Sequence, residues 1–158
     1  MTSNAFDQNL DGGNDELSKN LAKVISDLPL KYRHHDSLQK ISCMMFVDQR
    51  VIESFNKSSF EVMALTKIYP NGKIRILISK ELERNPRELQ IFVLHELLHI
   101  VGFDHPKQPC NWLSPGCGIM GQSPGRNMNI SAIDHKRLIE LSLSDSYLDK
   151  IPKHEWSH

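Results

Sequence analysis

A group of histidines near the middle of the chain has the spacing of a metal-binding site. The sequence follows the pattern H-E-x-x-H-x-x-G-x-x-H, with histidines at His95, His99 and His105. Because one helical turn separates His95 from His99, both imidazoles can bind the same Zn²⁺ ion from one helix. Gly102 can adopt the left-handed turn that ends a helix and reverses the chain, so that His105 becomes a third ligand.

Glu96, which follows the first of these histidines, has the chemistry that a catalytic zinc site needs. Three protein ligands leave the fourth zinc position open for water, whose pKa the metal lowers to about 7. A carboxylate beside that water can accept its proton and later transfer it to a leaving amine. The residues therefore predict one catalytic Zn²⁺ ion on His95, His99 and His105, with Glu96 as the general base.

The extended motif resembles the signature of the metzincin clan of zinc metallopeptidases, in which a methionine-containing turn follows the third histidine. Here Gly118-Ile119-Met120-Gly121 follows His105 in that way. The resemblance implies that Met120 lies as a hydrophobic floor beneath the zinc-binding histidines. It also implies that the protein is a zinc-dependent endopeptidase, which hydrolyses peptide bonds with metal-activated water.

The same resemblance implies an α+β fold, a small metzincin-like catalytic domain. We expect a twisted mixed sheet with an antiparallel edge strand, an active-site helix and a C-terminal helix. In metzincins the substrate binds in extended form along that edge strand, which precedes the active-site helix. The segment from Lys73 to Ser79 is the candidate here, with Ile74, Ile76 and Ile78 as its alternating residues. An internal strand is the alternative for this segment.

Departures from the metzincin pattern leave the subfamily open. Asp104 before the third histidine and a serine-led helix after the methionine turn look most like the matrixin branch. The stretch before that turn is longer than is usual in matrixins, and it contains Cys110 and Cys117, in the manner of the reprolysin branch. Some branches have an assisting tyrosine two residues after the methionine, where this chain has Gln122.

The cysteines and the remaining histidines do not extend the predicted metal site. Three cysteines are too few for a disulfide scaffold, although Cys110 and Cys117 could pair and stiffen the segment before Met120. Cys43 is expected to be a small buried side chain. The remaining histidines have no ligand spacing, and we expect them at the surface: His34, His35, His135, His154 and His158.

The helix that carries the first two histidines has the clearest start in the sequence. Asn85 is a predicted N-cap, Pro86 suits the first helical position, and Glu88 can complete a capping box. This helix is expected to end near Val101, before Gly102. The apolar residues of this helix should pack in the core, while His95 and His99 supply two of the metal ligands.

The other elements follow from hydrophobic periodicity and turn residues. Strands are expected at residues 41–47, 60–69 and 73–79, and the Pro70-Asn71-Gly72 turn should join the last two as a hairpin. Helices are expected from Asp15 to Leu28 and from Ser131 to about Leu143. The contact residues of the last helix are expected to be Ile133, Leu138, Ile139 and Leu141.

Length and composition indicate an ordinary globular protein. The chain has 158 residues, of which 39% are hydrophobic and 24% charged, and its net charge is zero. We expect a flexible tail at residues 1–14 and a single catalytic domain at 15–158. Zero net charge gives no electrostatic footprint for nucleic acid or an anionic membrane. The expected partner is a protein or peptide substrate, with no nucleic acid and no membrane, and the expected state is a monomer.

No signal peptide or membrane-spanning segment is visible in the sequence. The expectation is a cytoplasmic protein or one exported by a route that the sequence does not reveal.

Two other functions stay open. Gly102-Phe103-Asp104-His105 resembles the motif ending of bacterial single-zinc endoribonucleases of the rRNA-maturation type, although that family has glycine in place of Glu96. An inactive zinc-binding relative is the other alternative, which the intact Glu96 opposes.

Overall fold

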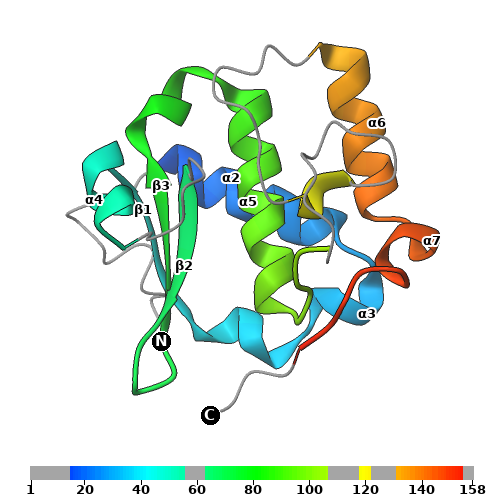
Figure 1. Cartoon of the computed structure of the whole chain (residues 1–158), viewed down its shortest axis with the longest axis horizontal. Helices are drawn as coiled ribbons and strands as arrows, with labels where there is room; N and C mark the ends of the chain where they lie inside the picture. Colours follow the sequence, from blue (N-terminus) through cyan, green and yellow to red (C-terminus); the bar gives the residue numbers. More distant parts are fainter. Residues whose placement is uncertain (1–14, 56–62, 107–117, 122–130, 155–158) are drawn as a thin grey trace.

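The structure, a computed structural model, describes residues 15–55, 63–106, 118–121 and 131–154. The predicted tail at 1–14, the Cys110–Cys117 pairing, Gln122 and His158 lie outside these residues. The elements, in chain order (Figure 1), are α2 (Asp15–Asp27), α3 (Leu30–Arg33), η1 (Asp36–Lys40), β1 (Ile41–Val47), α4 (Gln49–Phe55), β2 (Ala64–Ile68), β3 (Ile74–Ser79), η2 (Lys80–Arg84), α5 (Pro86–Ile100), η3 (Gly118–Met120), α6 (Ala132–Ser142) and α7 (Asp145–Leu148). Within the described part of the chain, no helix is long and apolar enough to cross a membrane.

The sheet has three strands in the order β1, β3, β2. Strand β3 pairs parallel with β1 and antiparallel with β2. The predicted hairpin between β2 and β3 is present, and the Gly72 N–H donates to the Tyr69 carbonyl at 2.8 Å in its turn. The fold is therefore a small α+β arrangement with a mixed sheet.

The prediction that residues 73–79 form the edge strand is wrong. Strand β3 has a partner on each side, and the side chains of Ile74, Ile76 and Ile78 are 2%, 0% and 0% exposed. Its nearly continuous apolar sequence is typical of a strand buried on both faces, and only Arg75 is exposed. In the described part of the chain, the antiparallel edge is β2.

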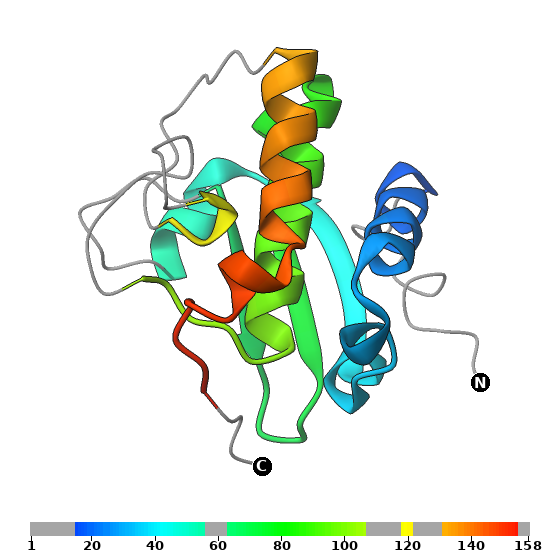
Figure 2. The same cartoon turned by 90° about the vertical axis from the view of Figure 1, so that its right-hand side faces the viewer.

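Helix α5 is the central element of the structure. It contacts α2, β2, η3 and α6, and Figure 2 shows α2 on one side of it, η3 on the other side and α6 in front of it. Because it packs against several elements, it is apolar on most of its surface rather than along one stripe. Its buried core residues include Ile91, Leu94 and Leu98, and its C-cap residue Val101 is also buried.

The side chains of Asn85, as predicted, and of Ser131 cap the starts of α5 and α6, but the predicted capping box is not formed, because the Asn85 N–H donates to the Leu82 carbonyl and not to Glu88. The Asn85 side chain accepts from the Glu88 N–H at 3.2 Å and donates to the Glu88 carboxylate at 3.0 Å. At α6, the Ser131 hydroxyl oxygen accepts from the Asp134 N–H at 3.1 Å. The hydrogen bonds from the Glu88 and Asp134 N–H groups satisfy donors that have no partner inside a helix.

The contact face of α6 differs from the expected one. Leu138 is buried, but Ile133 is 65% exposed and Leu141 is 41% exposed. Ile133 is five positions from Leu138, which places it on another side of the helix. In the described part of the chain, no element covers the side chains of Ile133 and Leu141, so these two residues do not make the expected contacts.

Candidate metal centre

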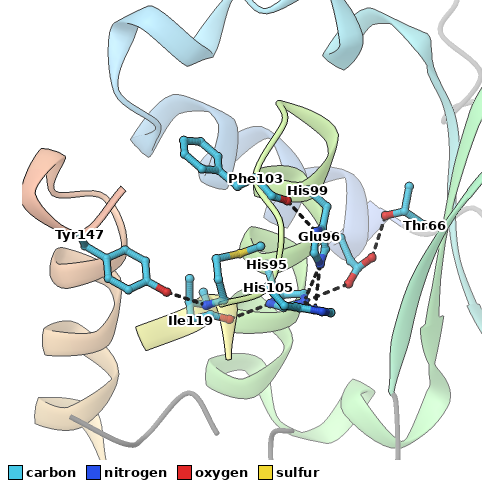
Figure 3. Close-up of polar contacts among 9 residues, drawn as sticks. Thr66, His95, Glu96, His99, Phe103, His105, Ile119 and Tyr147 are labelled. Atoms are coloured by element: carbon cyan, nitrogen blue, oxygen red, sulfur yellow. Dashed lines mark hydrogen bonds and ion pairs between the residues drawn. The ribbon is translucent and has the colours of Figure 1, made fainter. Parts of the chain in front are cut away.

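The three histidines that the spacing predicts as ligands lie together in the structure. Their Nε2 atoms are 3.0 Å apart for His95 and His99, 3.1 Å for His99 and His105, and 3.2 Å for His95 and His105 (Figure 3). The first two come from α5, and the third from the turn after it. Gly102 makes this turn with a φ of +114°, a conformation that side-chain-bearing residues rarely adopt.

Backbone carbonyls fix the orientation of two of these rings. The Nδ1 atom of His95 lies 2.6 Å from the Ile119 carbonyl oxygen, and that of His99 lies 2.8 Å from the Phe103 carbonyl oxygen. A carbonyl oxygen only accepts, so each Nδ1 carries the hydrogen and donates it. In a neutral ring, Nε2 then presents its lone pair, which is the tautomer that metal-binding histidines commonly have.

The imidazoles of His95 and His105 are neutral at neutral pH. Burial, followed by the nearby His99, lowers the pKa of His95 well below its usual value. The same causes lower the pKa of His105 to about 4. A metal ligand must be unprotonated, so these shifts favour the form of the side chains that binds a metal.

The spacing of the nitrogens fits a shared cation. Tetrahedral zinc with Zn–N distances of about 2.0–2.1 Å requires nitrogen atoms about 3.3–3.4 Å apart. The observed 3.0–3.2 Å is close to this separation. These three histidines can therefore hold a metal ion, and imidazole donors suit Zn²⁺ among several transition metals.

Glu96 lies beside this histidine cluster and is also buried. One carboxylate oxygen accepts from the Thr66 hydroxyl at 2.7 Å, and the other lies 3.8 Å from the Nε2 atom of His95. Since His95 is neutral, the second contact is not an ion pair. Burial raises the pKa of the Glu96 carboxyl, against the opposing effects of His99 and Thr66. The carboxyl is thus held next to the place where the three nitrogens converge.

Thr66 was not predicted to belong to the site. It lies on β2, 30 residues before Glu96 in the sequence. Its contribution depends on the packing of β2 against α5, which no local pattern reveals. A threonine in a predicted strand is ordinarily assigned to the sheet itself.

The methionine turn forms η3 and is held by Tyr147 of α7. The Met120 side chain is buried, and the Met120 N–H donates to the Tyr147 hydroxyl at 2.9 Å. A Cβ atom at Gly118 would lie 2.5 Å from Tyr147 Cε1, so only glycine fits there without displacing the ring. Tyr147 therefore supports the segment whose Ile119 carbonyl orients His95. The contact of the Met120 side chain with the imidazoles stays a prediction.

Replacing Tyr147 by phenylalanine should destabilise this segment. The Met120 N–H would lose its acceptor in a buried position, which costs about 1–3 kcal/mol in free energy of unfolding. Urea denaturation of the metal-free protein measures this cost. The matched control Tyr69→Phe, in the β2–β3 hairpin, should change the free energy by less than about 0.5 kcal/mol. Equal stabilities for the two variants would contradict the assigned role of the Tyr147 hydroxyl.

The other residues considered in the sequence have mixed outcomes. Cys43 is buried in β1, as expected. Among the remaining histidines, His34 is exposed, whereas His35 and His135 are half-buried. The half-buried His154 differs most from the expectation, because its Nδ1 contacts the carboxylate of Asp104, the residue before His105.

Comparison of the chain with models of known protein families, with curated proteins and with solved structures finds no match. The functional interpretation therefore depends on the residues and their arrangement.

Proposed function

We propose that this protein is a zinc-dependent endopeptidase of the metzincin type. The observation that carries the proposal is the convergence of three imidazoles beside a buried glutamate, within an extended motif that a methionine turn follows. His95, His99 and His105 would hold the ion. Bound zinc would supply a Lewis acid that activates water and polarises the scissile carbonyl.

Glu96 is the proton carrier in this mechanism. Its second carboxylate oxygen, 3.8 Å from His95 Nε2, accepts a proton as the water oxygen adds to the carbonyl carbon. The same oxygen then gives that proton to the peptide nitrogen as the carbon–nitrogen bond breaks. Thr66 holds the first oxygen at 2.7 Å, which fixes the orientation of the carboxylate. The products are a new carboxyl group and a new amine.

The edge of the sheet offers a place for an extended substrate. Strand β2 is the antiparallel edge in the described residues, and an extended peptide can pair with such an edge through backbone hydrogen bonds. Thr66 lies on β2 and contacts Glu96, so β2 runs beside the proposed general base. We therefore assign to β2 the substrate-binding role that the sequence suggested for residues 73–79.

Thr66→Val should reduce kcat by about 10-fold or more with little change in KM. The variant keeps the shape of the side chain but removes a hydrogen bond to a charged group, worth about 1.5–3 kcal/mol. Thr66→Ser, which retains the hydroxyl, should recover most of the rate. Steady-state kinetics on one peptide measures this, with zinc content as a control. If the serine variant is as slow as the valine variant, the hydroxyl is not the relevant group.

Parallel incubation of zinc-loaded protein with a diverse peptide mixture and with structured RNA tests the proposed function. Mass spectrometry of the peptides should reveal new termini, and the RNA should remain intact. Cleavage of RNA alone would overturn the proposal in favour of the endoribonuclease, which the Gly102-Phe103-Asp104-His105 ending resembles. Cleavage of neither, with zinc bound, would overturn it in favour of an inactive zinc-binding relative.

A further inference from the structure

The last described residues of the chain, Pro152–His154, lie against the turn that leads from α5 to His105. We call residues 152–154 the C-terminal strap. Lys153 forms an antiparallel bridge with Phe103. In Figure 1 and Figure 2, the red C-terminal segment runs past the yellow-green turn that follows α5. The two segments are about 50 residues apart in the sequence, so their pairing is a tertiary contact.

Backbone hydrogen bonds join the strap to the turn on both sides of the bridge. The Asp104 N–H donates to the Pro152 carbonyl at 2.8 Å, and the His154 N–H donates to the Gly102 carbonyl at 2.7 Å. A Cβ atom at Gly102 would lie 3.1 Å from the His154 carbonyl oxygen, so the absence of a side chain permits this close approach.

Side chains add to the same pairing. The imidazole of His154 contacts the Asp104 carboxylate through Nδ1. The ammonium of Lys153 lies 5.7 Å from the centre of the Phe103 ring, within the range of cation–π attraction. Phe103 is itself 1% exposed. The strap is therefore attached to three consecutive residues of the turn, through backbone and side chains.

These residues of the turn act directly on two of the predicted metal ligands. The Phe103 carbonyl accepts from His99 Nδ1 at 2.8 Å and so sets the orientation of that ring. Asp104 directly precedes His105 in the chain, so the position of the Asp104 backbone determines the position of the third ligand. The N-terminal side of the turn is tied to α5, through the Phe103 N–H and the Leu98 carbonyl at 2.9 Å. Asp104, in contrast, is tied to the strap.

We propose that the C-terminal strap is a positioning element of the metal centre: it holds the 102–104 turn so that His99 and His105 face His95. Contacts that orient metal ligands from outside the ligand set commonly change metal affinity by about 10–100-fold. The strap would contribute to affinity in this way without touching the ion. This inference concerns metal binding and does not require that the centre cleaves peptides.

Zinc affinity of full-length variants tests the strap directly. His154→Ala removes the contact with Asp104 and keeps the backbone hydrogen bond, and His154→Pro removes both. Titration with Zn²⁺ alone against a chelating indicator should give a Kd raised about 10-fold for the alanine variant and about 100-fold for the proline variant. The matched control His34→Ala changes an exposed histidine that lies outside the strap, and its Kd should equal that of the wild type.

A second readout separates positioning from general stability. Co²⁺ in place of zinc reports ligand geometry through its visible absorption, and His154→Ala should alter that spectrum while its far-ultraviolet circular dichroism stays that of the wild type. An unchanged Kd and cobalt spectrum in His154→Ala would overturn the proposal, as would an equal loss of affinity in His34→Ala. Absence of zinc binding by the wild type would also overturn it. Absence of peptide cleavage, by contrast, would count only against the proposed function.

Discussion

Replacing Glu96 by alanine should abolish peptide cleavage and leave zinc binding intact. The side chain is the proposed proton acceptor but not one of the three converging nitrogen donors. General acid–base groups contribute about 10²–10⁴-fold to rates, so the variant should be at least about 100-fold slower. Elemental analysis for zinc and the rate of cleavage of one peptide, measured on the same preparation, check both halves of the prediction.

Glu88 provides a matched control for this experiment. It is a second buried glutamate on α5, but it caps the helix through Asn85 instead of facing the histidines. Glu88→Ala should therefore lower stability and keep the rate of cleavage of the folded protein. The role assigned to Glu96 is wrong if Glu96→Ala cleaves normally, or if it loses zinc together with activity.

Replacing His105 by alanine should weaken zinc binding by more than about 100-fold. The variant leaves only two of the proposed protein ligands, both on α5. Changes to residues that orient metal ligands lower metal affinity by about 10–100-fold, so loss of a ligand itself should lower the affinity further. Competition with a chelating indicator measures the Kd. Zinc should also raise the Tm of the wild type but not that of the variant at the same concentration, because only bound ligand stabilises the native state.

His135→Ala is the control for the third ligand. His135 is half-buried on α6 and lies outside the histidine cluster, so its variant should bind zinc as tightly as the wild type. Unchanged affinity in His105→Ala would show that the third ligand is misassigned.

Features that depend on neighbouring residues were predictable from the sequence. The start of α5 follows from Asn85 and Pro86, and the structure has this cap. Strand β1 has the predicted bounds, and the turn before Lys73 joins β2 and β3 as expected. The convergence of His95 and His99 also needed only helical spacing. Helices α3 and α7, of four residues each, are too short to show periodicity, and they were not predicted.

Features that depend on distant segments were not predictable in this way. The position of β3 between β1 and β2 follows from a parallel pairing, and the alternation of Ile74, Ile76 and Ile78 fits an edge or an inner strand equally well. Thr66 and Tyr147 reach the centre from other elements, 30 and 27 residues away from the groups that they contact. Their residue types alone do not indicate such contacts.

Zinc titration of the metal-free protein, with the rate of peptide cleavage as the readout, tests the central claim most directly. The account predicts that the rate rises in proportion to added Zn²⁺ and reaches a plateau at about one equivalent, because the three histidines are proposed to bind one ion and the described part of the chain has one such group. Glu96→Ala should take up the same zinc without cleavage. Fully zinc-loaded wild-type protein that cleaves no peptide, or metal-free protein that cleaves as fast as the loaded form, would contradict the account.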